Sequence, residues 1–431
     1  MTGGITARYA GALRLAGILD EAGDRLRALA ATGARLCASP DLVASAALAP
    51  VTAATAESEV LEATAALLPL AAEAEVAAIA VRDATEWLRA ADEAVDLALS
   101  QARYAAGYGV GQLLAPTALV GGALAGALLP ASWWQAADGT LGHQVEAHPG
   151  LAEGAVGLLP GLVDGALGLP PGSHPTMPSL AGWAAGLHPE DGAVATTPTP
   201  LQVSASGTVP GSLTDLVEHL DQVNDLPDGD IEVQTVTLPD GTRQHLVYLP
   251  GTDDMDPLSH DGQVRDMQSN LELVAGLPTA YGAGVLGALH HTGMVFGEPV
   301  LIVGHSQGGM QAIALAAQQT PYQIAQVVTA GSPVGGVDLP ADVGAISLEH
   351  AGDPIPLTDA AGNPDAVNHV TITFESGSSG LAGNHGLDHY AAGAAAADAS
   401  HDPAVTAALG GLAPFFQSGE VSSTVYQITR P

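Results

Sequence analysis

The sequence predicts an α/β protein, in which a mostly parallel sheet with helices on both faces follows an all-α N-terminal domain. After Pro200, short runs of β-branched and aliphatic residues alternate with helical patterns, an order that builds a parallel sheet covered on both faces. Before Arg103, apolar residues recur at three-, four- and seven-residue spacing, as in amphipathic helices. We therefore expect a helical hairpin over residues 1–106, a Gly-, Ala- and Pro-rich connector over 107–200, and an α/β domain over 201–431.

The composition limits the classes of partner. The 431 residues include 46 acidic and 11 basic side chains, which give a formal net charge of −35. Without a basic stripe, this charge argues against nucleic acid and anionic membrane surfaces. The lone Cys37 excludes an internal disulfide and a thiolate metal cluster. Residues 1–14 lack a basic segment followed by an apolar core, so we expect no signal peptide, and either a cytoplasmic protein or export by a signal-peptide-independent route.

The N-terminal helical patterns run from about Ile5 to Arg35 and from about Thr52 to Arg103, with a break expected near Pro69. Two long helices joined by the proline-containing segment Ser39-Pro40-Asp41 favour an antiparallel hairpin. This arrangement resembles the small helical modules that precede other domains in proteins handled by the actinobacterial type VII secretion route. The turn has no Trp-x-Gly, and a packing or oligomerisation module is the other interpretation.

The connector begins with an uncharged stretch, Tyr104–Ala137, in which residues 113–129 are strongly apolar. Their length is near the lower limit for a bilayer-spanning helix, and Gly122 and Gly126 have the spacing that suits close helix packing in lipid. Prolines and frequent glycines favour a buried or docking helix instead, with membrane contact through 113–129 as the alternative. Residues 146–200 are expected to form a linker with short helical turns.

Within the α/β domain, turn and capping residues divide the chain into elements. A strand at Leu201–Ala205 and a helix capped by Ser212 or Thr214 precede a hairpin, whose strands Ile231–Leu238 and Gln244–Leu249 flank the turn Pro239-Asp240-Gly241. The expected elements that follow are helices at about Gly262–Ala275 and Thr279–His291, strands at Ile324–Thr329, Val343–Leu348 and His369–Phe374, helices near Tyr390–Ala397 and Pro403–Leu412, and an edge strand at Val421–Thr429.

The motif Gly304-His305-Ser306-Gln307-Gly308-Gly309 follows an aliphatic run, Pro299–Val303, and precedes an alanine-rich helical segment, about Met310–Gln319. Gly-x-Ser-x-Gly between a strand and a helix is the nucleophile-elbow pattern. Such a turn is so tight that only hydrogen side chains fit two positions before and after the serine. It presents the serine hydroxyl at the N-terminus of the helix, so Ser306 is the predicted nucleophile.

A serine hydroxyl becomes nucleophilic when an imidazole takes its proton and a carboxylate fixes the tautomer of that imidazole. In this type of site the chain order is serine, acid, histidine. Asp353 is the predicted acid, because it lies just past the Val343–Leu348 strand, where ligand-facing loops emerge. Glu349, still close to the strand, and Asp365, in a looser loop, are the alternatives.

His385 is the predicted base, because it stands at a loop-to-helix junction after a Gly/Ser-rich run. His389 is the alternative base, although it would already be inside the helix. The two histidines also have metal-ligand spacing, but no third ligand is evident, so we expect no metal.

An oxyanion hole needs two preorganised backbone N–H groups. Gln307, the residue after the nucleophile, is expected to supply one of them. The other comes from the loop after an earlier strand, here Tyr248–Asp254. The chain can turn towards the serine at the Gly251-Thr252 peptide, so we predict that the second donor is the N–H of Thr252.

With these residues in this order, the region from about 200 to the C-terminus resembles the α/β-hydrolases of the lipase and esterase kind. The resemblance rests on the Gly304–Gly309 motif, on Pro250-Gly251-Thr252, on Gly352-Asp353-Pro354 and on His385 before a helix. It implies hydrolysis of a small-molecule or lipid ester through an acyl-serine intermediate, without a cofactor. A thioesterase or amidase with the same triad is an alternative, as is a non-catalytic, secretion-linked interaction protein on the same scaffold.

The segment between Leu249 and Pro299 departs from that family pattern. It shows two helices and no strand, where the full fold would place another strand. Either the sheet is reduced or this segment forms a cap over the site, and both would affect the size of the substrate.

Overall fold

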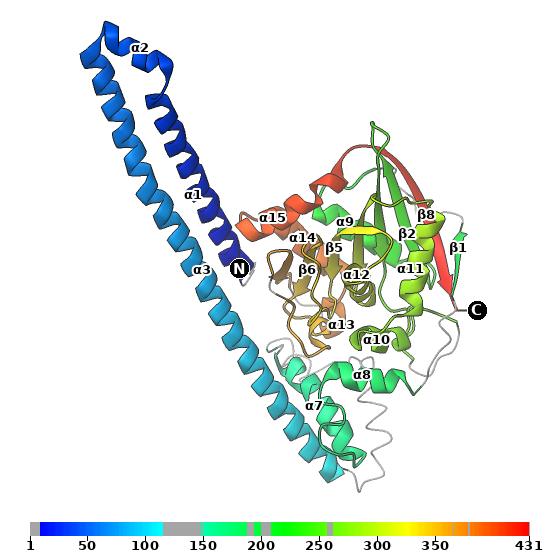
Figure 1. The fold of residues 1–431 in the computed structure, drawn as a ribbon. Coiled ribbons are helices and arrows are strands. Elements are labelled where there is room, and N and C mark those ends of the chain that lie inside the picture. The colour runs from blue at the N-terminus through cyan, green and yellow to red at the C-terminus, as the bar shows by residue number, and fades with distance from the viewer. Residues whose placement is uncertain are drawn as a thin grey trace. The chain divides into compact units, whose positions relative to one another are not determined.

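The computed structural model of the chain describes residues 9–114, 148, 150–187, 194–199, 208–256, 262–364, 366–377 and 380–430. It has a long helical region at the N-terminus and a mixed sheet flanked by helices towards the C-terminus (Figure 1). The α/β class predicted from the sequence is therefore confirmed. The chain divides into two compact units, Arg8–Val95 and Asp96–Pro431.

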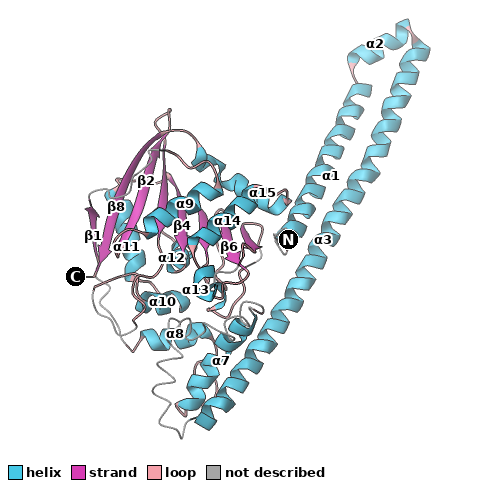
Figure 2. Cartoon of the chain, turned by 180° about the vertical axis from the view of Figure 1, so that it is seen from behind, coloured by secondary structure: helices cyan, strands magenta, loops and turns pink. Residues whose placement is uncertain are grey.

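The first unit pairs helix α1 (Ala10–Cys37) with the first part of α3 (Pro50–Leu114), and the short helix α2 (Pro40–Leu48) lies between them in the chain (Figure 2). Ion pairs Arg27–Glu75 and Asp20–Arg82 join the two long helices, which run antiparallel. Among the described residues of this unit, the buried apolar side chains are all alanine, namely Ala16, Ala30, Ala53, Ala71 and Ala78. Small side chains therefore let the two helix backbones approach each other.

Helix α3 continues through Pro69, so the expected break there is wrong. Proline removes one backbone donor, but the Ala- and Leu-rich turns on both sides have high helix propensity and carry the helix onward. By length and composition alone, Pro50–Leu113 is the one helix among the described residues that could cross a membrane, which is a weak indication because core helices of soluble proteins meet the same criteria. Residues 115–129 of the apolar stretch lie outside the described residues.

Two well-formed helices, α7 (Gly150–Ala166) and α8 (Met177–Ala185), replace the expected linker with short helical turns. Glycines bring α7 close to the end of α3: a Cβ at Gly161 would lie 2.0 Å from the carbonyl oxygen of Tyr104. The buried Asp164 accepts a hydrogen bond from the Tyr104 hydroxyl at 2.6 Å. The helices are longer than the short turns expected, because backbone contact, which local glycine content does not show, orders this segment.

Eight strands form one sheet in the order β1-β8-β2-β3-β4-β5-β6-β7. Neighbours from β3 to β7 are parallel, and β1, β8, β2 and β3 pair antiparallel. The carboxyl ends of the parallel strands therefore share one edge of the sheet. The strands are β1 (Ala195–Thr199), β2 (Asp230–Thr237), β3 (Arg243–Leu249), β4 (Pro299–His305), β5 (Gln323–Ala330), β6 (Gly344–His350), β7 (His369–Phe374) and β8 (Glu420–Thr429).

Strand β8 lies between β1 and β2, so the prediction of an edge strand there is wrong. Strand β1 covers it, and Pro198 in β1 suits an outer position because proline has no N–H to donate. The sheet thus includes five residues before position 201, where the α/β domain was expected to begin. The strand expected at Leu201–Ala205 lies outside the described residues.

Helices cover both faces of the sheet. Helices α11 (Ala280–His291) and α12 (Gln307–Ala317) pack on one face, and α9 (Leu213–Asn224), α14 (Leu387–Asp398) and α15 (Pro403–Leu412) pack on the other. The Ser212 side chain caps α9 by accepting from the N–H of Asp215 at 3.0 Å. Short helices α10 (Met267–Val274), α13 (Gly380–Asn384), Ile355–Leu357 and Ala413–Phe416 complete the unit.

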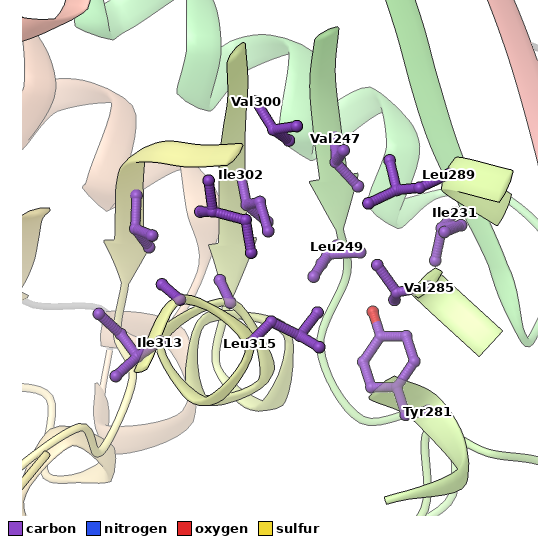
Figure 3. Packing of buried hydrophobic residues seen from close by; sticks show 14 of the residues in the cluster. Ile231, Val247, Leu249, Tyr281, Val285, Leu289, Val300, Ile302, Ile313 and Leu315 are labelled. Carbon is purple, nitrogen blue, oxygen red and sulfur yellow. The ribbon is translucent and has the colours of Figure 1, made fainter. Parts of the chain in front are cut away.

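An apolar cluster of 25 buried residues fills the space between the sheet and helices α11 and α12. Figure 3 shows Val247, Leu249, Val300 and Ile302 of the strands beside Val285 and Leu289 of α11 and Ile313 and Leu315 of α12. Burying each such side chain contributes roughly 1.5–3 kcal/mol. Because α11 belongs to this core, it covers the sheet rather than forming a cap, and no strand occurs among the described residues between β3 and β4.

Candidate active site

Ser306 lies in a strained turn between β4 and α12. Its backbone angles are φ 52° and ψ −119°, a conformation that non-glycine residues rarely adopt. The flanking glycines are required by close backbone contact: a Cβ at Gly304 would lie 2.4 Å from the carbonyl carbon of Gly308, and a Cβ at Gly308 would lie 2.0 Å from the carbonyl oxygen of Leu249. The crowding that the sequence motif predicts on both sides of the serine is therefore present.

Asp353 and His385 form a hydrogen-bonded pair in which the acid is buried and the histidine is partly exposed. Asp353 follows β6, and His385 lies between α13 and α14. The distance from His385 Nδ1 to Asp353 Oδ2 is 2.6 Å, and the two side chains are 20% and 0% exposed. Since Nδ1 donates its proton to the carboxylate, Nε2 is the ring nitrogen that remains to accept a proton.

Two further groups donate to the carboxylate of Asp353. The hydroxyl of Tyr390 donates to Oδ2 at 2.6 Å, and the N–H of Ile355 donates to Oδ1 at 3.0 Å. Burial raises the pKa of Asp353, but the charge of His385 and the hydrogen bonds outweigh burial, so the pKa lies below its ordinary value. No local pattern indicates the role of Tyr390, because only the packing of α14 brings it to the acid.

The alternative site residues have other partners. The Glu349 carboxylate accepts from Asn363 Nδ2 at 2.5 Å, and His389 Nδ1 lies 2.7 Å from the hydroxyl of Ser376. Asp365 lies outside the described residues. The acid and histidine that the structure brings together are thus Asp353 and His385.

His305 links the serine turn to His385. Its Nε2 lies 3.0 Å from the carbonyl oxygen of His385, so the Nε2–H donates this bond, and the two rings are 4.5 Å apart. Burial, with the neighbouring His385, lowers the pKa of His305 to about 3, which keeps its ring neutral. Within the described residues no hydrogen bond joins the Ser306 hydroxyl to the imidazole of His385. Such bonds are often long before substrate binds.

The backbone N–H groups of Thr252 and Gln307, near the serine turn, have no hydrogen-bond acceptor among the described residues. Gln307 begins α12, and first-turn amides of a helix have no acceptor within the helix. The peptide before Thr252 is close to the serine, because a Cβ at Gly251 would lie 3.3 Å from Ser306 Cβ. Paired N–H groups of this kind can bind an oxyanion.

The fold and this site together describe an α/β protein in which a histidine bonded to a buried acid lies close to a serine in a strained turn. In the part of the chain that the structure describes, no group of three or more His, Cys, Asp or Glu side chains could hold a metal ion. No protein-family model matches the sequence, and no curated protein or solved structure is significantly similar to it.

Proposed function

We propose that the protein is a serine hydrolase that cleaves carboxylic esters through an acyl-serine intermediate, on an α/β-hydrolase scaffold. The observation that carries the proposal is the hydrogen bond of 2.6 Å between His385 and the buried Asp353, close to a serine held at φ 52°. A strained backbone and a buried carboxylate are both costly, and such features concentrate at functional sites. The parallel strands β3–β7 and the chain order Ser306, Asp353, His385 support the scaffold.

In the proposed reaction, Ser306 Oγ attacks the carbonyl carbon of the ester while its proton passes to Nε2 of His385. The resulting oxyanion accepts hydrogen bonds from the N–H groups of Gln307 and Thr252. As the tetrahedral intermediate collapses, His385 protonates the leaving alkoxide, and an alcohol departs from the acyl-serine. Asp353 stays ionised throughout and holds the tautomer of the imidazole.

The second half of the reaction restores the enzyme. Water gives a proton to His385 Nε2 as its oxygen attacks the acyl carbonyl carbon. Collapse of this second tetrahedral intermediate breaks the bond to Ser306 Oγ, which regains its proton from His385, and a carboxylic acid leaves. The substrate is expected to be an uncharged small-molecule or lipid ester, because a net charge of −35 disfavours strongly anionic ligands.

Ser306→Ala is expected to lower kcat on short p-nitrophenyl esters by at least about 10⁴-fold, because it removes the nucleophile. A fluorophosphonate probe should label the wild-type protein and not the variant. Ser347→Ala is the control, since it removes the hydroxyl of a buried serine outside the proposed site, which is bonded to Thr329 and His369. Undiminished turnover in Ser306→Ala, or a wild-type protein that the probe does not label, would rule out the proposed function.

A further inference from the structure

Arg265 is a buried arginine outside the predicted site residues. It is 1% exposed and is among the largest fully buried side chains of the protein. It lies just before α10, in the segment between β3 and β4. Burying a guanidinium is costly unless the group is paired and hydrogen-bonded, so its contacts are informative.

Those contacts converge on the loop that follows β3. Arg265 Nη1 donates to the carbonyl oxygen of Gly251 at 3.1 Å, and Nη2 lies 2.8 Å from Asp253 Oδ2. The main-chain oxygen of Arg265 accepts from the N–H of Asp253 at 2.8 Å and of Asp254 at 3.2 Å. One residue therefore holds the loop by both its side chain and its backbone.

The bond to Gly251 has a directional consequence for the next residue. In a planar trans peptide, the carbonyl oxygen and the following N–H point to opposite sides. Because the Gly251 carbonyl points to the buried guanidinium, the Thr252 N–H points away from it. That N–H has no acceptor among the described residues, and its peptide adjoins Ser306.

The neighbouring peptides have anchors of their own. The Tyr281 hydroxyl donates to the carbonyl oxygen of Pro250 at 3.3 Å, and Asn270 Nδ2 donates to Thr252 Oγ1 at 3.0 Å. Neither bond involves the carbonyl of the Gly251–Thr252 peptide, which Arg265 binds. Glycine allows this peptide to rotate at little steric cost, and a rotated peptide would present a carbonyl oxygen where the N–H is needed.

We propose that Arg265 is a positioning residue of the oxyanion hole: its guanidinium fixes the Gly251–Thr252 peptide so that the Thr252 N–H is directed at the substrate oxyanion. The inference rests on the proposed function and adds a residue to it. Arg265 touches no reacting atom. Its effect is to keep one donor oriented before the substrate arrives, which is the preorganisation that makes such donors effective.

The kinetic test compares Arg265→Ala with the wild type on p-nitrophenyl esters. Losing one oriented donor should lower kcat about 100-fold and leave KM unchanged, because the donor acts mainly on the transition state. Added guanidinium ion should restore part of kcat by occupying the vacated site. Arg265→Lys, which keeps the charge and is the second variant if Arg265→Ala does not fold, should lower kcat about 10-fold through loss of the fixed geometry.

Arg243→Ala is the matched control, because Arg243 is also bonded to a carboxylate, that of Glu298, but at the opposite end of β3. It should lower Tm and keep the wild-type kcat. The inference is overturned if Arg265→Ala and Arg265→Lys keep kcat within threefold, or if guanidinium restores nothing.

Crystal structures of the Arg265 variants supply a readout that does not depend on turnover. We expect a rotated or multiply oriented Gly251–Thr252 peptide. An unchanged peptide would overturn the inference even in an active esterase. A rotated peptide in a protein whose wild type cleaves no ester would instead count against the proposed function alone.

Discussion

The two halves of the sheet each hold a buried carboxylate bonded to a histidine. In the parallel half, Asp353 and His385 are 2.6 Å apart; in the antiparallel half, Glu232 of β2 and His219 of α9 are 2.9 Å apart. Both carboxylates are 0% exposed. Each pair consists of a carboxylate and an imidazole, so any difference in function between the two pairs must come from their surroundings.

In the antiparallel half, neighbouring side chains bond to both members of the pair or pack against them. Gln234 Nε2 lies 3.0 Å from the same His219 nitrogen that meets Glu232, the Ser423 hydroxyl donates to Glu232, and the ring of Tyr248 is 4.4 Å from that of His219. In the parallel half, His385 meets its acid through Nδ1, and its side chain is 20% exposed, against 10% for His219. An acid–histidine pair thus supports a catalytic proposal where it lies at the carboxyl ends of parallel strands, close to a serine in a strained turn.

The largest expected effect separates the two pairs by activity. Asp353→Asn should lower kcat on p-nitrophenyl esters about 10⁴-fold, because an amide cannot hold the His385 tautomer that accepts the serine proton. Glu232→Gln, the same change in the other pair, should leave kcat within about twofold. Equal losses in both variants would remove the functional distinction between the halves of the sheet.

The next largest expected effect distinguishes the two acid–histidine pairs by what they contribute to stability. Glu232→Ala should lower the free energy of unfolding in urea by about 3–5 kcal/mol, because it leaves His219 buried without its carboxylate. Burial raises the pKa of Glu232, but the hydrogen bond and charge of His219 outweigh burial, so the folded pKa lies below its ordinary value. The stabilisation should therefore be present above about pH 4.5 and be lost as the pH falls through the lower folded pKa. If the free energy of unfolding that Glu232→Ala loses relative to the wild type stays constant down to pH 3, this account is contradicted.

Local residue patterns were enough to predict much of the α/β unit. Ser212 caps α9, and the turn at Pro239-Asp240-Gly241 joins β2 and β3, because capping and turn geometry depend on neighbouring residues. The strain at Ser306 follows likewise from the glycines around it. The pairing of Asp353 with His385 could be predicted because each carries its own local signal, at a strand end and at a helix start.

Contacts between residues distant in the sequence could not be predicted in this way. Strand β8 was expected at an edge because nothing in its own residues indicates that β1, more than 200 positions earlier, pairs with it. Tyr390 and Arg265 reach the site only through the packing of α14 and of the segment before α10. Buried polar side chains of this kind are identified by their partners, which a single sequence does not show.

The smallest expected effect concerns Glu349, a carboxylate near the site that is bonded to an amide instead of a histidine. Burial, with the charge of Asp359, raises the pKa of Glu349 from 4.5 to about 7. Because the folded pKa is the higher one, the protonated group favours folding below about pH 4.5, and this contribution is lost as the pH rises through 7. Glu349→Gln should therefore raise the free energy of unfolding by about 2–3 kcal/mol at pH 8 and change it little at pH 4.

Urea unfolding from pH 4 to pH 8 measures that difference, and Glu420→Gln, at an exposed position, is the matched control that should show none. The kcat of Glu349→Gln should stay within about twofold of the wild type, since His385 is bonded to Asp353. A kcat loss as large as that of Asp353→Asn would make Glu349 the acid of the site. If the free energy of unfolding of Glu349→Gln, relative to the wild type, does not increase between pH 5 and pH 8, the Glu349 carboxylate ionises at no cost. Burial beside Asp359 would then not distinguish Glu349 from an exposed acid.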